Sequence, residues 1–336
     1  MKLVIAHRER LVREALRRSV ARSRFELVAQ SSDMESLKKD CRKHAPQLLL
    51  VELELLGNKA EQLPGLLGFD ASVIALASTS AMAGAYEAMG HGALGLIEPP
   101  AIDETGEIIG AQRLLSRMER LVGLVAEAPR TKVPTVSAKP SKSAPILAIG
   151  ASTGGPLALA KVLSDLPADF EASVLIVQHI ESEFSGGLAE WLGGQSRLPV
   201  SIAVRGATPE PGKVYLAGPG GHLVLSRSLQ FGLQPARRDE LHVPSINALF
   251  GSLAELSSPG AAVILTGMGS DGVEGMGALQ RRGWLTVAQD EASSVVYGMP
   301  RAALEVGAAK QSLALNAIAP ALVRHFRKRN AGKGNC

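Results

Sequence analysis

Cysteine is almost absent from this chain, since only Cys41 and Cys336 occur among 336 residues. Two cysteines cannot build the disulfide framework on which small secreted domains depend. Aromatic residues make up only 4% of the chain, which argues against a protein that stacks nucleic-acid bases. The longest hydrophobic runs are as short as strands, so we expect neither a membrane-spanning helix nor a signal peptide. These features predict a cytoplasmic protein that is not inserted into a membrane.

The net charge of +4 is confined to short parts of the chain. Basic and acidic residues balance within residues 1–125, and acidic residues outnumber basic ones in residues 145–322. The excess of Lys and Arg therefore lies in residues 126–144 and in residues 323–336. Because neither stretch is expected to form a folded face, the sequence does not indicate a nucleic-acid partner.

The length predicts two domains, and residues 126–144 separate them. This segment, EAPRTKVPTVSAKPSKSAP, is rich in Pro, Ser, Ala and Lys and has no hydrophobic period, as is typical of a linker. We therefore assign residues 1–125 to a first domain, 145–326 to a second domain, and 327–336 to a basic tail.

Strand-like and helix-like segments alternate through residues 1–125, which predicts a doubly wound parallel sheet of the flavodoxin type. The strand-like segments are residues 2–6, 25–30, 47–53, 71–77 and 93–97, and the helix-like segments are 9–21, 34–44, 81–89 and 108–125. Their order and length resemble the receiver domain of two-component response regulators.

The residues that perform receiver chemistry are missing at the matching positions. Receivers carry an acidic pair after the first strand and a phosphoacceptor aspartate after the third; here His7 and Arg8 replace the pair, and Glu52 replaces the aspartate. Ala77 and Glu98 stand where the family has a hydroxyl residue and a lysine. Without the acidic pair, little would hold Mg²⁺. We expect a pseudo-receiver that is not regulated by standard aspartyl phosphorylation.

The alternation resumes after residue 145 and indicates a mixed α/β domain that is mostly parallel. The strand-like segments are residues 146–149, 173–178, 200–204, 213–218, 222–226, 261–267 and 284–289, and the helix-like segments are 157–163, 185–192, 245–256, 274–282, 300–306 and 317–326. The hairpin-like spacing of residues 200–226 predicts an antiparallel portion.

A glycine-rich turn, GASTGGP at residues 150–156, joins the first of these strands to the first helix. Ser152 lies on this turn, close to the unpaired N–H groups and the positive dipole end of the helix. Such a serine is either an anion-binding hydroxyl or a nucleophile beside an oxyanion hole. Similar turns occur in many α/β proteins that bind nothing, so the turn alone leaves the function open.

A serine nucleophile needs a base and an acid that orients the base. The second domain offers His179, His222 and His242, of which His179 directly follows a strand and so lies at the same sheet edge as Ser152. Asp271, in the glycine-rich loop after a later buried strand, is the best-placed acid. No His or Cys pairs have metal-ligand spacing, so we expect no metal site and no cofactor.

Two motif matches point elsewhere. Residues 150–154 fit the G-x-S-x-G elbow of α/β-hydrolases, but in that fold the acid precedes the histidine, and here the histidine comes first. Residues 267–272 fit the dinucleotide-binding G-x-G-x-x-G, with Asp290 near the expected ribose-binding position. Against this, Asp271 places a carboxylate where a pyrophosphate would lie. A dinucleotide-binding protein and a non-catalytic signalling adaptor are the alternatives.

Six stretches of the second domain together resemble the chemotaxis receptor methylesterases of the CheB type, which join a receiver to a carboxyl-terminal esterase domain. These stretches are IGASTGGP, VQH, VYLAGPGGH, PSINALF, VILTGMGSDGVEGM and AQDEASSVVYGMPRAA. The resemblance implies a three-layer α/β methylesterase domain with Ser152 as nucleophile, His179 as general base and Asp271 as orienting acid. It makes the backbone N–H groups near Thr153 and Met268 candidates for the oxyanion hole.

The resemblance also implies a reaction and its partners. The expected reaction is hydrolysis of glutamate γ-methyl esters on methyl-accepting chemoreceptor-type proteins, and the same site is suited to attack a glutamine amide. A signalling kinase and motility-complex proteins are further expected partners. The sequence departs from the family pattern at residues 180–184 and 217–220, in loops that face the substrate, so these departures concern the choice of target.

Overall fold

The computed structural model describes residues 1–21, 23–56, 71–77, 86–89, 91–103, 105–123, 145–181, 184–237, 240, 242–256 and 259–331. The chain divides into two compact units, Met1–Ala126 and Glu127–Cys336. The expected linker, residues 126–144, lies outside the described residues. Within the described part of the chain, no helix is both long and apolar enough to cross a bilayer.

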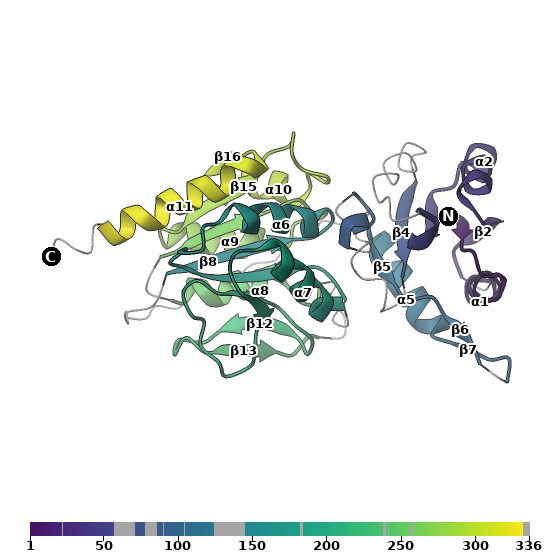
Figure 1. Ribbon diagram of the computed structural model, residues 1–336, viewed down its shortest axis with the longest axis horizontal. Helices are drawn as coiled ribbons and strands as arrows, with labels where there is room; N and C mark the ends of the chain where they lie inside the picture. Colours follow the sequence, from purple (N-terminus) through teal and green to yellow (C-terminus); the bar gives the residue numbers. More distant parts are fainter. Residues whose placement is uncertain are drawn as a thin grey trace. The chain divides into compact units, whose positions relative to one another are not determined.

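The first unit contains a five-stranded parallel sheet with the strand order β2-β1-β3-β4-β5 (Figure 1). This is the flavodoxin-type order, so the predicted fold class of this unit is confirmed. The strands are β1 (Lys2–Ala6), β2 (Glu26–Ser31), β3 (Leu48–Glu52), β4 (Ser72–Leu76) and β5 (Gly95–Ile97).

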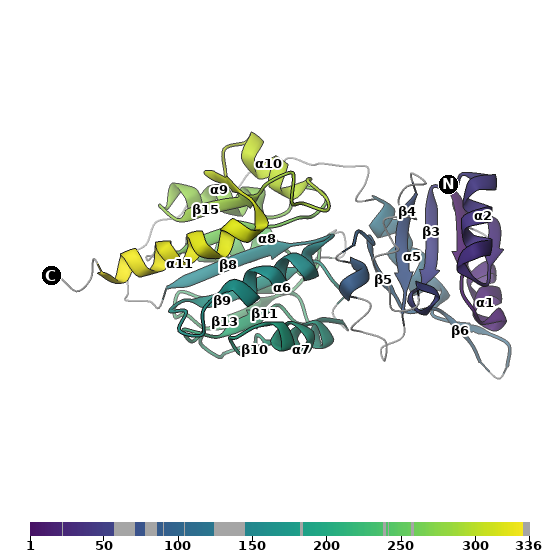
Figure 2. The ribbon, with the colours of Figure 1, turned by 45° about the horizontal axis from the view of Figure 1, so that its top comes forward.

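Helices cover both faces of this sheet (Figure 2). Helices α1 (Arg10–Val20) and α5 (Ala111–Gly123) contact each other and bury Leu16 and Met118 against apolar side chains of β1 and β3. Helix α2 (Met34–His44) contacts β1 and β2 and begins at a capping box, in which Asp33 accepts the N–H of Ser36. The inner strands β1, β3 and β4 are therefore almost wholly buried, as parallel strands covered on both faces usually are.

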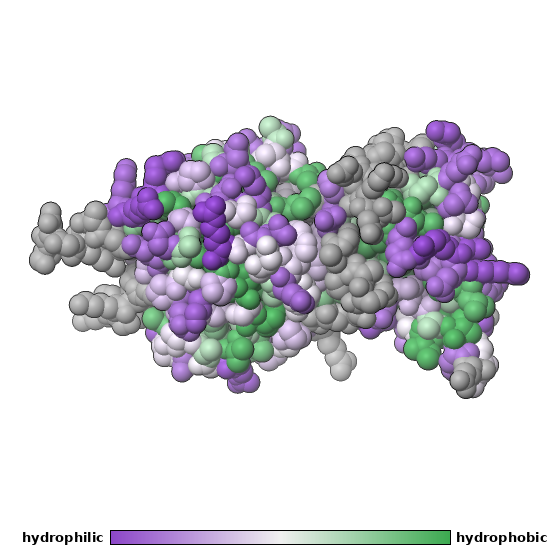
Figure 3. All heavy atoms as spheres, viewed as in Figure 1, coloured by the Kyte–Doolittle hydropathy of each residue, from purple (hydrophilic) through white to green (hydrophobic). Residues whose placement is uncertain are grey.

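The predicted helix at residues 108–125 begins later than expected. Ile108–Ile109 form a short strand, β7, paired antiparallel with β6 (Ala101–Ile102), and α5 starts only at Ala111. The intervening Gly110 has a φ of +89°, which ends the strand and is incompatible with a helix. Figure 3 shows hydrophobic residues gathered over this hairpin. Leu11 of α1 and Ile109 of the hairpin are exposed.

Of two further segments of this unit, one differs from the prediction and the other is described only in part. The strand expected at residues 47–53 ends at Glu52, and a 3-10 turn, η1 (Leu53–Leu56), follows it. Of the helix expected at residues 81–89, only residues 86–89 are described, and they are helical.

The second unit contains a seven-stranded sheet with the order β10-β11-β9-β8-β14-β15-β16, and every neighbouring pair is parallel. The strands are β8 (Ile146–Ala151), β9 (Ser173–Gln178), β10 (Val200–Ile202), β11 (Val214–Leu216), β14 (Ala261–Ile264), β15 (Leu285–Gln289) and β16 (Gln311–Leu313). A separate hairpin joins β12 (His222–Leu225) to β13 (Phe231–Gln234).

Two groups of helices sandwich this sheet, which confirms the expected three-layer α/β class (Figure 2). One group is α6 (Gly155–Asp165), α7 (Ser185–Gln195) and α11 (Leu315–Ala331). The other is α8 (Ile246–Ala254), α9 (Val273–Arg281) and α10 (Met299–Glu305), which share an apolar core with the hairpin and the sheet. Phe250 and Met276, both fully buried, lie in this core.

The antiparallel pair is formed by other strands than the hairpin-like spacing of residues 200–226 predicts. β10, the edge strand of the main sheet, pairs parallel with β11, and β12 pairs instead with β13, which was not predicted. All three residues of β11 are buried, as in a parallel strand, and such a short apolar run carries no period that distinguishes the two arrangements. Strand β16 was also missed, and α11 continues to Ala331, past the expected start of the basic tail at residue 327.

The strand order reverses beside β8. The chain moves from β8 to β9 and then to the β11–β10 edge, before it returns to β14 on the other side of β8 and proceeds to β16. Ligand sites in doubly wound sheets lie at the carboxyl ends of the strands near such a reversal. The loops that follow β8, β9 and β14 therefore form the natural site of this unit.

Candidate active site

The three predicted catalytic residues follow three neighbouring strands. Ser152 directly follows β8, His179 directly follows β9, and Asp271 lies in the loop between β14 and α9. Backbone hydrogen bonds hold these loops together: the N–H of His179 donates to the carbonyl of Ala151 (3.0 Å), and the N–H of Ser152 donates to the carbonyl of Thr266 (3.1 Å). The sheet thus brings the three side chains to one edge.

His179 and Asp271 form a direct hydrogen bond. Nε2 of His179 lies 2.7 Å from Oδ2 of Asp271, and the two side chains are only 11% and 4% exposed. A carboxylate can only accept, so Nε2 carries the hydrogen, and Nδ1 of the neutral ring keeps its lone pair. Nδ1 is buried and has no hydrogen-bond partner among the described residues. The imidazole is therefore held in the tautomer that can accept a proton at Nδ1.

Asp271 accepts hydrogen bonds from the start of α8 as well as from His179. Its carboxylate accepts hydrogen bonds from Ser245 Oγ (3.0 Å) and from the N–H groups of Ile246 (2.7 Å) and Asn247 (3.0 Å). Burial alone would raise the pKa of Asp271, but the hydrogen bond and charge of His179, the charge of His242 and the backbone donor lower it below its ordinary value. The group is therefore a carboxylate at neutral pH.

Ser152 lies in a narrow turn between β8 and α6. Gly154 adopts a φ of +79°, and Gly267 approaches so closely that a Cβ at position 267 would lie 2.6 Å from Cβ of Ser152. The Ser152 residue is 8% exposed. Its hydroxyl makes no hydrogen bond with Nδ1 of His179 in this arrangement of the described residues; such bonds are often long in substrate-free enzymes.

The two candidate oxyanion donors lie on the loops that flank Ser152. Thr153 is the next residue in the turn, and Met268 follows Gly267 in the adjacent loop. Within the described part of the chain, neither backbone N–H finds a hydrogen-bond acceptor. Both donors are thus available to a ligand.

The three histidines that the sequence offers as a general base have different surroundings. The ring of His242 stacks on that of His179, with centroids 4.3 Å apart and an interplanar angle of 11°. His222 is buried; its Nε2 contacts Glu240 (2.6 Å), and its Nδ1 accepts the N–H of Ser245 (3.0 Å). His179 therefore bonds the acid, while His222 supports the segment that carries Ser245.

Ser245 is a site residue that the sequence reasoning missed. It caps α8 by accepting the N–H of Ala248, and its hydroxyl also donates to Asp271. A serine just before a helical pattern is a recognisable N-cap signal, but nothing in the sequence shows that this helix begins against Asp271.

Three metal-ligating groups converge here, since ligand atoms of His179, His242 and Asp271 lie within 4.8 Å of one another. A metal ion binds an imidazole in the plane of the ring, and two stacked, nearly parallel rings do not direct their lone pairs at one point. Asp271 Oδ2 also already accepts from His179 and Ile246. The arrangement suits a proton relay better than a tetrahedral metal centre.

Known proteins resemble this chain over most of its length. The family model for the CheB methylesterase matches residues 147–322. The chain is 39% identical, over 96% of its own length and 97% of the relative, to protein-glutamate methylesterase/protein-glutamine glutaminase 1 of Cupriavidus pinatubonensis. The chain belongs to the CheB methylesterase family. Ser152, His179 and Asp271 all lie within the matched region.

A second relative is similar over most of this chain, and a solved catalytic domain is similar over about half of it. Protein-glutamate methylesterase/protein-glutamine glutaminase 3 of Pseudomonas savastanoi is 36% identical, over 97% of this chain and 99% of the relative. The crystal structure of the CheB methylesterase catalytic domain of Thermotoga maritima superposes with a TM-score of 0.52 at 35% identity, covering 55% of this chain and 99% of that domain. The similarity to the two methylesterase/glutaminase relatives therefore extends over both units.

Family membership and the site together argue against the dinucleotide alternative. The carboxylate of Asp271 accepts the N–H of Gly272 (2.9 Å) at the start of α9. That N–H group is one of those that a bound pyrophosphate would need, so the chain's own acid occupies the anion position of this loop.

The receiver-like unit holds a different cluster at its degenerate phosphoacceptor position. Glu52, 8% exposed, accepts the N–H of Arg8 (2.7 Å), and the Arg8 guanidinium lies 3.5 Å from its other oxygen. His7 Nδ1 lies 3.6 Å from Glu52 and accepts the N–H of Glu9 (3.1 Å). Burial, the largest influence, lowers the pKa of His7. An arginine thus pairs with the carboxylate at the edge where a receiver would hold Mg²⁺.

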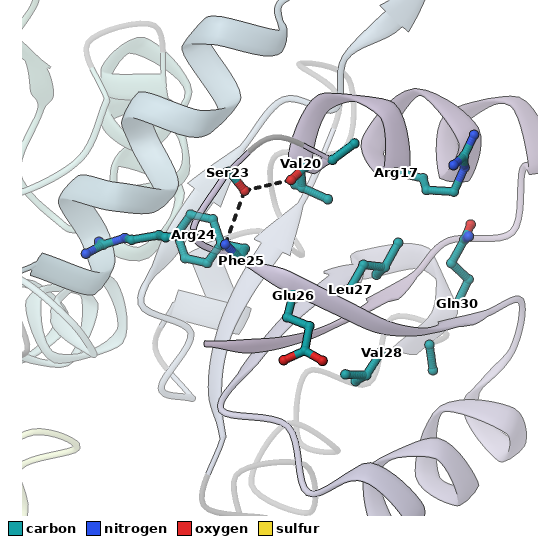
Figure 4. Close-up of a pocket in the computed structure, with 11 residues that line it drawn as sticks. Arg17, Val20, Ser23, Arg24, Phe25, Glu26, Leu27, Val28 and Gln30 are labelled. Atoms are coloured by element: carbon teal, nitrogen blue, oxygen red, sulfur yellow. Dashed lines mark hydrogen bonds between the residues drawn. The ribbon is translucent and has the colours of Figure 1, made fainter.

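A cavity of about 630 Å³ in the same unit contains none of the predicted site residues (Figure 4). It lies between the end of α1 and the edge strand β2, and Ser23 hydrogen-bonds the carbonyl of Val20 within it (2.8 Å). Its Arg17 is paired with Glu14 on the same helix. We assign no chemistry to this cavity.

Proposed function

We propose that this chain is a protein-glutamate methylesterase in which Ser152, His179 and Asp271 act as a catalytic triad. The observation that carries the proposal is the hydrogen bond between His179 Nε2 and Asp271, which leaves Nδ1 as a base at the edge where Ser152 lies. The names of the relatives support the reaction type, because they are protein-glutamate methylesterases.

In the proposed reaction, Ser152 Oγ attacks the carbonyl carbon of a glutamate γ-methyl ester, and His179 Nδ1 takes the hydroxyl proton. The N–H groups of Thr153 and Met268 bind the resulting oxyanion. The ester bond to methoxide then breaks, and the imidazolium returns its proton so that methanol leaves. Asp271 stabilises the imidazolium. Water, activated by His179, cleaves the acyl-enzyme and leaves a glutamate and a regenerated serine.

The same atoms would release ammonia from a glutamine side chain, and the relatives are also named as glutaminases. We propose methyl-accepting chemoreceptor-type proteins as substrates and place the reaction in the cytoplasm, with a signalling kinase and motility-complex proteins as further partners. We retain residues 145–326 as the catalytic domain, a proposal supported by the compact second unit. The pairing of Glu52 with Arg8 supports regulation without aspartyl phosphorylation.

The test is methanol release from a methylated chemoreceptor fragment. Ser152→Ala should lower kcat by at least about 10³-fold, since the nucleophile is lost. Ser228→Ala, which changes an exposed serine, is the matched control and should be as active as the wild type. Methanol release by Ser152→Ala at the wild-type rate would reject the nucleophile, and a wild type without release would reject the function.

A further inference from the structure

Gln178, the last residue of β9, joins the backbones of the proposed nucleophile and base. Its side chain is buried, with the residue 1% exposed. Nε2 donates to the carbonyl of Ser152 (2.9 Å) and to that of His179 (3.1 Å). One carboxamide therefore ties together the loops after β8 and β9.

The Ser152 carbonyl accepts a second hydrogen bond, from the N–H of Gly155 (2.8 Å). A carbonyl oxygen has two lone pairs, so both are used, and the orientation of the Ser152–Thr153 peptide is fixed. A trans peptide is planar, with its C=O and N–H pointing in opposite directions. By holding the carbonyl of Ser152, Gln178 also sets the direction of the Thr153 N–H, the candidate oxyanion donor.

The pocket around Gln178 is shaped for this carboxamide. A Cβ at position 155 would lie 1.9 Å from Oε1 of Gln178, so the amide fits only beside a glycine. Oε1 is buried and has no hydrogen-bond partner among the described residues. A position that served packing alone would favour an apolar side chain here, because a buried acceptor without a partner is unfavourable. The two N–H bonds to the catalytic loops account for the amide.

We propose that Gln178 is a positioning residue of the esterase. Its carboxamide holds Ser152, the Thr153 N–H and His179 in one frame, so that nucleophile, oxyanion donor and base keep the geometry of the reaction. This inference rests on the proposed function of the site and adds to it a residue that never touches the ester.

The first test replaces Gln178 with Met, which is similar in length but has no donor. We expect kcat for methanol release to fall about 100-fold with little change in KM, because geometry is lost and substrate contacts are kept. Labelling of Ser152 by a serine-reactive phosphonate should slow in parallel yet reach the wild-type endpoint, since the sites remain folded. Gln280→Met, which removes an amide that donates to the exposed carbonyl of Gly307, is the matched control.

The second test uses Gly155→Ala, whose methyl group must displace the Gln178 amide. Alone it should lower kcat about tenfold or more. In a Gln178→Ala background the close contact that remains is with Cβ of Ala151 at 3.0 Å, so its further effect should be much smaller, within about threefold. This comparison of single and double variants does not use Gln178→Met, so it remains informative if that variant folds poorly.

The outcomes separate this inference from the proposed function. If the wild type releases methanol through Ser152 and Gln178→Met matches Gln280→Met in kcat, the positioning role is wrong and the esterase stands. Equal effects of Gly155→Ala in both backgrounds would also contradict it. A wild type that releases no methanol rejects the function itself.

Discussion

A histidine and a carboxylate meet at the carboxyl edge of a parallel sheet in both units, but their relation differs. In the first unit, His7 Nδ1 stands 3.6 Å from Glu52 and accepts an N–H from Glu9, so it donates nothing to the acid. In the second, His179 Nε2 lies 2.7 Å from Asp271 and donates to it. Similar residue types at equivalent edges thus form different sites.

The neighbour of each carboxylate explains the difference. Glu52 pairs with Arg8, which also pairs with Glu54, so a permanent cation satisfies the acid and the imidazole stays outside the relay. Asp271 has no arginine or lysine partner among the described residues, and its other donors are backbone N–H groups and the hydroxyl of Ser245. Its charge therefore acts on His179. A proton relay requires a carboxylate that pairs with the imidazole and not with a permanent cation.

Removing the charge of Asp271 should have the largest effect on the second unit's site. Asp271→Asn should lower kcat for methanol release by about 10³- to 10⁴-fold, because the amide does not fix the imidazole tautomer. It should also loosen the start of α8, since an amide nitrogen cannot accept the N–H bonds that the carboxylate accepts. Asp290→Asn is the control and should retain activity within about threefold. Equal rates for the two variants would make Asp271 a turn residue only.

The lowered pKa of Asp271 predicts an acid-dependent loss of stability in the second unit. A carboxyl group whose pKa is lower in the folded than in the unfolded state stabilises the fold fully above its unfolded pKa of about 3.9. That contribution is lost as the pH falls from there towards the folded pKa. Thermal unfolding between pH 7 and pH 2 should therefore show Tm of the wild type approaching that of Asp271→Asn below about pH 4. A constant difference in Tm across this range would contradict the pairing.

Substitution of His242 should disturb the same proton relay to a smaller extent. His242→Ala removes a ring that stacks on His179, and an aromatic pair contributes about 1 kcal/mol, so kcat should fall about fivefold. His242→Phe keeps an aromatic face and should stay close to the wild type. Wild-type kcat in His242→Ala would show that the stack does not help to hold the base.

For the first unit we expect no phosphorylation of Glu52. Incubation with a small phosphodonor and Mg²⁺ should leave no stable label, because Arg8 already pairs with Glu52 and no acidic pair holds the metal. Glu52→Gln serves to locate any label that does form. Stoichiometric phosphate that is present in the wild type and absent from Glu52→Gln would overturn the pseudo-receiver.

Much of this architecture could be predicted from local patterns. Long alternations of strand and helix gave both sheets, and the rule that loops follow the carboxyl ends of parallel strands placed Ser152, His179 and Asp271 at one edge. Short strands such as β11 and β16 were misplaced or missed, since three residues carry too little pattern to reveal their partners.

The supporting residues of the site could not be predicted in the same way. Gln178 and Ser245 act through carbonyl and carboxylate oxygens that lie 26 positions away in the chain. Neither has a spacing that marks its role, and each depends on how loops from separate strands meet. The stacking of His242 on His179 likewise follows from tertiary packing.

The proposed reaction depends most on Ser152 as a nucleophile whose proton His179 accepts. Its most direct test is labelling of the full chain with a serine-reactive phosphonate, followed by location of the adduct by peptide mass spectrometry. We expect one adduct, on Ser152, that forms at least about 10³-fold more slowly in His179→Ala. An adduct on another serine, or labelling of Ser152 at an unchanged rate without His179, would contradict it.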